Sequence, residues 1–239
     1  MFDLPRHRVY PVETVNVRLV PEPHPFETRN LAAIDENWLA EKAANPALFD
    51  GTMVLLSSLS YDGTNLEGRC HAIRFATFLH WRRHRSTGGA EHAFAHAMLV
   101  ASDNALVAIR MGQHTANPGR VYFAAGSFEP MDFPDGTADL HFNMAREVTE
   151  ETGVSIDGIP RESQQYFISL ETGTVIFRRY FLEEDAETIA ARIREFVAKE
   201  EDPEIEGPVV IRHAQDIPDK LISHMGPLVA WHFANPPAR

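Results

Sequence analysis

The stretch R-E-V-T-E-E-T-G-V at residues 146–154 determines how the rest of the chain is interpreted. Its three glutamates, Glu147, Glu150 and Glu151, stand at positions i, i+3 and i+4, and a helix with about 3.6 residues per turn places them on one face. Arg146 is expected to point away from that face. Three like charges so close together repel one another, so a compensating cation is expected, and oxygen-only ligands on a rigid element suit Mg²⁺ or Mn²⁺.

The three glutamates also have a simpler explanation, because exposed glutamate is a common helix former and a solvated helix face needs no metal. The complete residue string favours the metal. It matches R-E-U-x-E-E-x-G-U, where U is a bulky apolar residue, at every specified position. This pattern is the second half of the Nudix box, and the chain therefore resembles the Nudix hydrolase superfamily.

The first half of the box departs from the family's pattern. The family has a glutamate eight residues before the arginine, where this chain has Ala138, and a glycine fourteen residues before it, where this chain has Asp132. Asp139 could supply the missing carboxylate or could cap the helix, and its place at the expected helix start favours the cap. The loop at 126–130 is expected to replace the glycine loop of the family, with several residues inserted.

The resemblance implies a fold and a set of roles. The fold is α/β (α+β), a mixed β-sheet sandwiched between helices. Glu147, Glu150 and Glu151 would bind the metal, and Arg146 would form a structural pair that holds the box loop. The expected chemistry is attack of a metal-activated water on a phosphorus of a diphosphate. The base that takes the water's proton is Glu147 or a glutamate of a later loop, and the later candidates are Glu200, Glu201, Glu204 and Glu206.

Three residues are expected to bind substrate. Arg110 and Arg120 flank a loop that contains glycine and proline, and either could clamp a phosphate through two parallel hydrogen bonds. The alternative for both is ion pairing with an acidic surface. Glu129 is the third, and it belongs to the Gly-x-x-Glu-Pro loop at 126–130.

Segments before the box carry a looser resemblance to the Nudix subgroup related to the UDP-glucose and UDP-galactose pyrophosphatase. They are N-L-A at 30–32, N-P-A-L-F-D-G at 45–51 and the loop at 126–130. The resemblance implies a nucleoside diphosphate sugar as the substrate. A dinucleotide or a coenzyme A diphosphate is the alternative substrate, and a catalytically weak Nudix-fold module that binds nucleotides or regulates is the alternative function.

Composition limits the class of protein. The chain has 239 residues, a formal net charge of -12 and a pI near 5.4, which argues against a protein that coats nucleic acid, because backbone binding needs a basic surface. The start of the chain lacks the apolar core of a secretory signal, and no run approaches the roughly 18 apolar residues of a membrane span. We expect a cytoplasmic monomer or homodimer that acts on a small molecule, without nucleic-acid or membrane partners.

Residue patterns predict the remaining elements. Strands are expected at 14–20, 53–60, 67–73, 93–101, 105–111, 121–124, 166–170, 174–182 and 209–212. Helices are expected at 30–44, 75–85, 139–152 and 186–199, with a short terminal helix from 218 onward. The S-T-G-G stretch at 86–89 is the expected boundary between an N-terminal α+β extension, 1–88, and a Nudix hydrolase domain, 89–239.

Overall fold

The chain folds into two β-sheets with helices packed against both. The structure is a computed structural model that describes residues 1–84 and 89–237. The strands are β1 (Phe2–Asp3), β2 (Val9–Val12), β3 (Thr14–Val20), β4 (Thr52–Tyr61), β5 (Asn65–Arg74), β6 (Ala93–Val100), β7 (Leu106–Met111), β8 (Val121–Tyr122), β9 (Gln165–Leu170), β10 (Gly173–Phe181) and β11 (Ile205–Ile211). The helices are α1 (Pro25–Ala44), α2 (Phe75–Arg83), the 3₁₀ helix η2 (Pro130–Asp132), α3 (Leu140–Thr152), α4 (Ala186–Val197) and α5 (Met225–Ala234).

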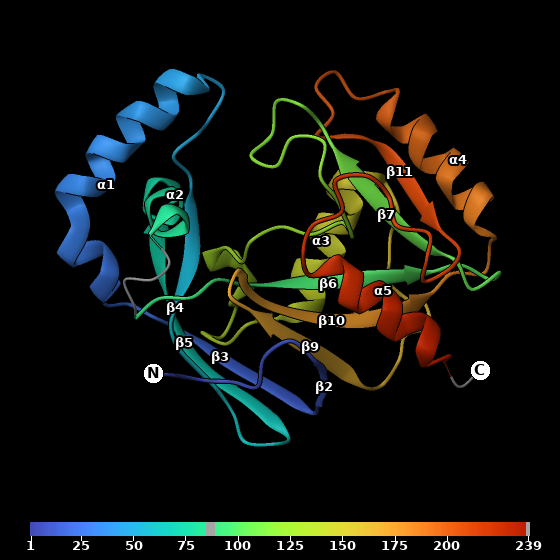
Figure 1. The fold of residues 1–239 in the computed structure, drawn as a ribbon, viewed down its shortest axis with the longest axis horizontal. Helices are drawn as coiled ribbons and strands as arrows, with labels where there is room; N and C mark the ends of the chain where they lie inside the picture. Colours follow the sequence, from blue (N-terminus) through green and yellow to red (C-terminus); the bar gives the residue numbers. More distant parts are fainter. Residues whose placement is uncertain (85–88, 238–239) are drawn as a thin grey trace.

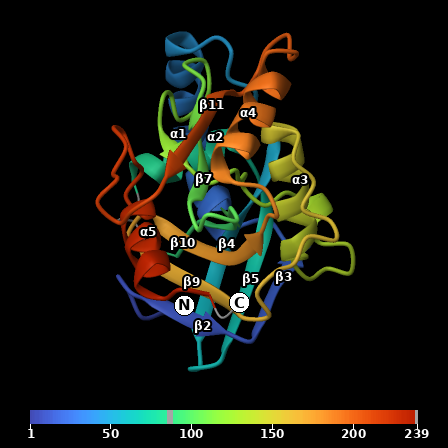
Figure 2. The same ribbon diagram turned by 90° about the vertical axis from the view of Figure 1, so that its right-hand side faces the viewer.

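The larger sheet has the order β11-β7-β6-β10-β9-β2, and β8 pairs with β7. Strands β6 and β10 run parallel, whereas their neighbours pair antiparallel, so the sheet is mixed. Figure 1 shows α5 in front of this sheet, and Figure 2 shows the sheet between α5 on one side and α3 on the other. The predicted mixed sheet sandwiched between helices is confirmed.

The smaller sheet has the order β1-β4-β5-β3, and helices α1 and α2 lie beside it (Figure 1). Successive residues of a strand point to opposite faces, and β4 follows this rule. Met53 and Leu55 pack with Trp81 in a small cluster, whereas Val54 and Leu56 join the main core. The main core therefore continues from the larger sheet into the smaller one.

The loop before α3 is hydrogen-bonded to the smaller sheet. Val54 N–H donates to Phe128 O at 2.9 Å, Leu19 N–H donates to Gly136 O at 3.0 Å, and Ala138 N–H donates to Val17 O at 2.9 Å. These backbone partners satisfy polar groups of the loop that no regular element of its own would satisfy. The smaller sheet thus fixes the loop that leads into α3.

Most predicted elements are present, and the errors lie at their ends. The first long helix begins at Pro25, not at residue 30, because proline suits the first helical turn. The last strand begins at Ile205, not 209, and the terminal helix begins at Met225, not 218. Strands β1 and β2 were not predicted, since each is short and pairs only at a sheet edge. Residue 85 of the second predicted helix and residues 86–88 of the predicted boundary lie outside the described residues.

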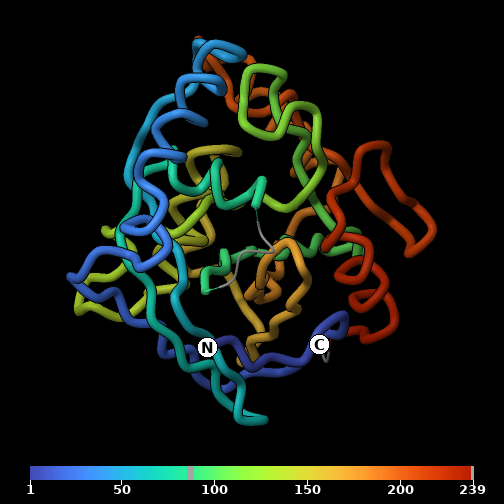
Figure 3. Tube along the Cα trace, turned by 60° about the vertical axis from the view of Figure 1, so that its left-hand side comes forward, coloured from blue at the N-terminus to red at the C-terminus, as the bar shows by residue number. Residues whose placement is uncertain are grey.

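The N-terminal segment contributes to both sheets. Strand β2 pairs antiparallel with β9, with Val9 opposite Ile168 and Val12 opposite Gln165. Figure 3 shows this blue segment reaching across to the C-terminal half of the chain. The division into an extension at 1–88 and a domain at 89–239 remains a prediction. Within the described ranges, no helix combines the length and the apolar character needed to cross a membrane.

Candidate active site

Helix α3 carries the three glutamates singled out by their spacing. The Asp139 carboxylate accepts a hydrogen bond from Phe142 N–H at 3.0 Å, which satisfies a free donor of the first turn. Gly153 ends the helix in the left-handed region at φ 68°. The cap function predicted for Asp139 is confirmed, and the helix is held at both ends by local sequence signals.

Glu147 and Glu151 point inward, against the turn formed by Ala125 and Gly126. They are 8% and 6% exposed. The Glu151 Oε2 atom accepts a hydrogen bond from Ala125 N–H at 2.9 Å. A Cβ atom at Gly126 would lie 2.2 Å from Glu147 Oε1, so only glycine lets the turn approach this carboxylate so closely. This contact agrees with the prediction that the loop at 126–130 replaces the glycine loop of the family, and that role remains a prediction.

Arg146 turns back toward the carboxylates, so the expectation that it points away from them is wrong. Its Nη1 lies 2.7 Å from Glu147 Oε1 and 3.2 Å from Glu150 Oε2, and its Nη2 lies 3.3 Å from Asp132 Oδ2. A long side chain can curl across the helix surface to reach opposite charge, which Cβ direction alone does not predict. The pair with Asp132 joins α3 to η2, as expected of a pair that holds the box loop.

Asp132 is a buried carboxylate beside α3 that the sequence interpretation did not include among the candidate site residues. It is fully buried, and its Oδ2 accepts hydrogen bonds from Glu129 N–H at 2.8 Å and Asn143 Nδ2 at 2.9 Å, besides the Arg146 contact. The family has a glycine at this place, so the sequence pattern presents Asp132 only as a departure from the box. The available signal was Glu129-Pro130-Met131-Asp132, which has the spacing of a reciprocal capping box.

Burial and mutual repulsion favour the protonated form of the two inner glutamates. Burial, with the charges of Glu150, Asp132 and Glu129, raises the pKa of Glu147 to about 7, although Arg146 acts in the opposite direction. Burial and the charge of Glu147 raise the pKa of Glu151 well above its ordinary value. The single guanidinium of Arg146 therefore does not balance the negative charge collected here.

The residues fit a hard divalent cation. The available donors are carboxylate oxygens, together with the buried Asn143 Oδ1, which accepts no hydrogen bond from the described residues. No three His, Cys, Asp or Glu side chains in the described ranges converge as a complete ligand set. Arg146 draws Glu147 and Glu150 toward itself, and Ala125 N–H holds Glu151. The donor chemistry fits the metal, and the carboxylates would need to turn toward it.

Among the four later glutamates, Glu204 has an electrostatic connection to this cluster. Its charge contributes to the raised pKa of Glu151 and of Tyr122. Its backbone O accepts a hydrogen bond from Gly112 N–H at 2.7 Å, which fixes the chain just before β11. Glu206 instead accepts a hydrogen bond from Gln113 Nε2 at 2.6 Å.

The three expected substrate-binding residues lie in different surroundings. Arg110 Nη1 donates to Gly119 O at 3.1 Å and Asp219 O at 3.4 Å, so it supports the loop after β7. The Arg120 side chain is exposed. Glu129 stands at the start of η2, and its charge acts on both Arg146 and Glu147. Substrate binding by these residues remains a prediction.

A pair of buried histidines lies on the α5 side of β6. His96 Nε2 and His224 Nε2 are 2.9 Å apart, so one ring donates and the other accepts. Burial lowers the pKa of His224 to about 3 and that of His96 well below its ordinary value. The pair is therefore neutral, and it packs close to Tyr122, with ring centroids 6.3 Å from His96.

Comparisons with known proteins gave structural matches only. No family model and no curated protein matches the chain. A MutT protein from Methanosarcina mazei Go1 is 21% identical over 39% of this chain and 66% of its own, just under two thirds, with a TM-score of 0.28. A NUDIX hydrolase from Nitrosomonas europaea is 16% identical over 51% and 72%, with a TM-score of 0.31. The ORF135 protein of E. coli is 14% identical over 61% and 93%, with a TM-score of 0.37. Two of these three proteins thus carry the names MutT and NUDIX hydrolase.

Proposed function

We propose that this chain is a Nudix-type hydrolase that cleaves a diphosphate linkage by attack of water on phosphorus. The observation that carries the proposal is the arrangement of α3. Glu147 and Glu151 are buried against the Ala125–Gly126 turn, with Glu150 beside them and too little positive charge to balance them. Burying uncompensated carboxylates is costly unless a cation joins them.

Asp132 supports turnover over a purely binding role. Ala138 lacks the carboxylate that the family has in the first half of its box, and that absence alone would favour a module without catalysis. Asp132 provides a buried carboxylate from another position and pairs with Arg146. We infer that Asp132 takes the place of the missing carboxylate beside α3.

Each residue has a role in this proposal. Glu147, Glu150 and Glu151 would hold Mg²⁺ or Mn²⁺, which when bound offsets the diphosphate charge and lowers the pKa of water. Arg146 and Asp132 keep the box loop against α3. Glu204 is the proposed base among the four later candidates, because its charge acts on Glu151.

A nucleoside diphosphate sugar is the proposed substrate, and a nucleoside monophosphate and a sugar 1-phosphate are the products. Support comes from the Gly-x-x-Glu-Pro loop at 126–130 and from its attachment to the smaller sheet, where Val54 N–H donates to Phe128 O. The smaller sheet of the N-terminal part therefore lies beside the proposed site, where it can contact the substrate.

The test is hydrolysis of a panel of nucleoside diphosphate sugars, dinucleotides and coenzyme A, with Mg²⁺, Mn²⁺ or chelator. Glu150→Gln and Glu151→Gln remove single carboxylates from α3. Glu195→Gln is the matched control, because Glu195 lies exposed on α4 and pairs with Lys199 at 2.8 Å, away from α3.

We expect metal-dependent cleavage of one substrate class, lost in both α3 variants and kept in Glu195→Gln. Cleavage of dinucleotides or coenzyme A, and not of nucleoside diphosphate sugars, would refute the proposed substrate but support the proposed hydrolase activity. Tight metal-dependent nucleotide binding without turnover would refute the hydrolase proposal and indicate a binding module.

A further inference from the structure

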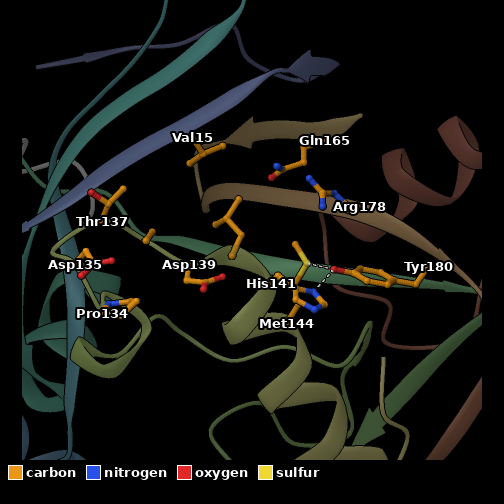
Figure 4. Close-up of a pocket in the computed structure, with 12 residues that line it drawn as sticks. Val15, Pro134, Asp135, Thr137, Asp139, His141, Met144, Gln165, Arg178 and Tyr180 are labelled. Carbon is orange, nitrogen blue, oxygen red and sulfur yellow. Dashed lines mark hydrogen bonds between the residues drawn. The ribbon is translucent and has the colours of Figure 1, made fainter. Parts of the chain in front are cut away.

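A separate pocket lies beside the first turn of α3, where both sheets and the box loop meet. Its volume is about 380 Å³. Its wall combines Val15 of β3, residues of the loop at 134–139, and Gln165, Arg178 and Tyr180 of β9 and β10. Figure 4 shows Gln165 and Arg178 on one side and Asp135 and Thr137 on the other. The glutamates of the candidate active site do not line it.

Two polar atoms of lining residues are buried without a hydrogen-bond partner in the described ranges. They are Arg178 Nε, a donor, and Gln165 Oε1, an acceptor. Buried polar groups are nearly always satisfied, and each exception needs an explanation. Since both residues line one pocket, a bound molecule with an acceptor at one place and a donor at another would satisfy both.

Neighbouring side chains of the described residues do not supply a hydrogen-bond acceptor for Arg178 Nε. The nearby carboxylate of Glu162 is already engaged, with both oxygens accepting from Arg179 at 2.7 Å. Tyr180 Oη is bonded to His141 Nδ1 at 2.9 Å. Burial lowers the pKa of Arg178, and the like charge of Arg161 lowers it further. An anion beside Arg178 would stabilise its charged form, which burial and the charge of Arg161 both disfavour.

The opposite side of the pocket favours hydrogen-bond donors. Asp135 is exposed there, next to the Thr137 hydroxyl, while Asp139 is occupied by the helix cap. Val15, Leu140 and Met144 supply apolar surface between the two ends. One end of the pocket therefore combines the Arg178 cation with the Gln165 acceptor, and the other end offers further hydrogen-bond acceptors.

We propose that this pocket binds a small hydroxylated anion, with its phosphate or carboxylate on Arg178 and its hydroxyl groups donating to Gln165 Oε1 and Asp135. The volume of the pocket admits a molecule the size of a hexose phosphate. Binding here is independent of the hydrolase proposal, since the pocket uses a different set of side chains from the metal site.

The experiment is isothermal titration calorimetry with glucose 6-phosphate, gluconate and neutral glucose as probes. Chelator is present throughout, so that no divalent cation can recruit an anion to the α3 glutamates. The two anions separate phosphate from carboxylate recognition, and glucose tests the need for charge. The variants are Arg178→Gln and Arg178→Lys, with Arg194→Gln on the exposed face of α4 as the matched control.

We expect at least one anion to bind the natural chain, with glucose much weaker. Arg178→Gln should weaken binding about ten- to a hundredfold, the range for a hydrogen bond to a charged group, Arg178→Lys should weaken it less, and Arg194→Gln should leave it unchanged. Equal binding by Arg178→Gln, or no binding of either anion at millimolar concentration, would overturn the proposal. If Arg178→Gln does not fold, judged by circular dichroism, Gln165→Leu takes its place, and unchanged binding in that variant would also overturn the proposal.

Discussion

Replacing Gly126 by alanine tests whether the turn positions the Glu147 carboxylate. The new Cβ would lie 2.2 Å from Glu147 Oε1, whereas ordinary contact begins at 3.4 Å, so the carboxylate must move by about 1 Å. A displacement of this size in a reacting group can lower the rate about a hundredfold. We therefore expect kcat/KM for the substrate found in the panel to fall about a hundredfold.

Stability should change much less than activity in this variant. The φ of Gly126 is not in the left-handed region, so alanine is compatible with the backbone and restricts the unfolded chain, a gain of up to about 1 kcal/mol. This gain offsets part of the cost of moving a flexible carboxylate. Urea unfolding should place the free energy of unfolding within about 1 kcal/mol of the natural chain.

Gly226→Ala is the matched control for the same chemical change. A Cβ at Gly226 meets no atom within 4 Å, and the residue lies in α5. Alanine there should leave kcat/KM unchanged and stabilise the helix slightly. The reasoning is refuted if Gly126→Ala keeps kcat/KM within about threefold of the control, since Glu147 would then tolerate the displacement.

Three further changes test the same site. Asp132→Asn should lower the free energy of unfolding by about 2 kcal/mol, because it removes a buried charge bonded to Arg146; a loss under about 0.5 kcal/mol in urea unfolding would contradict this. In metal-free protein, the folded state holds the Glu147 proton up to a pKa of about 7, above its ordinary 4.5, so stability should fall by up to about 3 kcal/mol as pH rises between these values. The fall should become smaller in Glu147→Gln, in which Glu151 keeps a raised pKa, and a pH-independent stability of the natural chain would refute it. Glu204→Gln should lower kcat about 10²- to 10⁴-fold with little change in KM, whereas Glu201→Gln should not, and equal effects of the two would remove Glu204 as the base.

Local sequence patterns were sufficient to predict most elements of this chain. Apolar runs on either side of the turns near Asp62 and Glu171 predicted β4, β5, β9 and β10 to within about two residues, because such turn signals are set by a few neighbouring residues. The helical stripe of α4 and the caps of α3 are likewise local. Edge pairing is not local, and β1 and β2 were missed because their partners are distant in sequence.

The helix face with three glutamates was predictable from the sequence. The burial of these glutamates and the position of Arg146 were not. The spacing of Glu147, Glu150 and Glu151 places them together on any helix. Their burial depends on the Ala125–Gly126 turn, which precedes α3 by more than ten residues and packs against Glu147 and Glu151. The inward turn of Arg146 depends on Asp132, which packs there only when η2 folds against α3.

The sequence by itself therefore determined the helix, its cap at Asp139, its end at Gly153 and the face that carries the charge, because these follow from contacts within a few residues. The tertiary structure alone decided that Asp132 is buried against Arg146 and Asn143, that the charge of Glu204 acts on Glu151, and that Gln165 and Arg178 share a pocket. Each of these is a contact between segments far apart in the chain. Side-chain types restrict such contacts, but packing of the whole core selects among them.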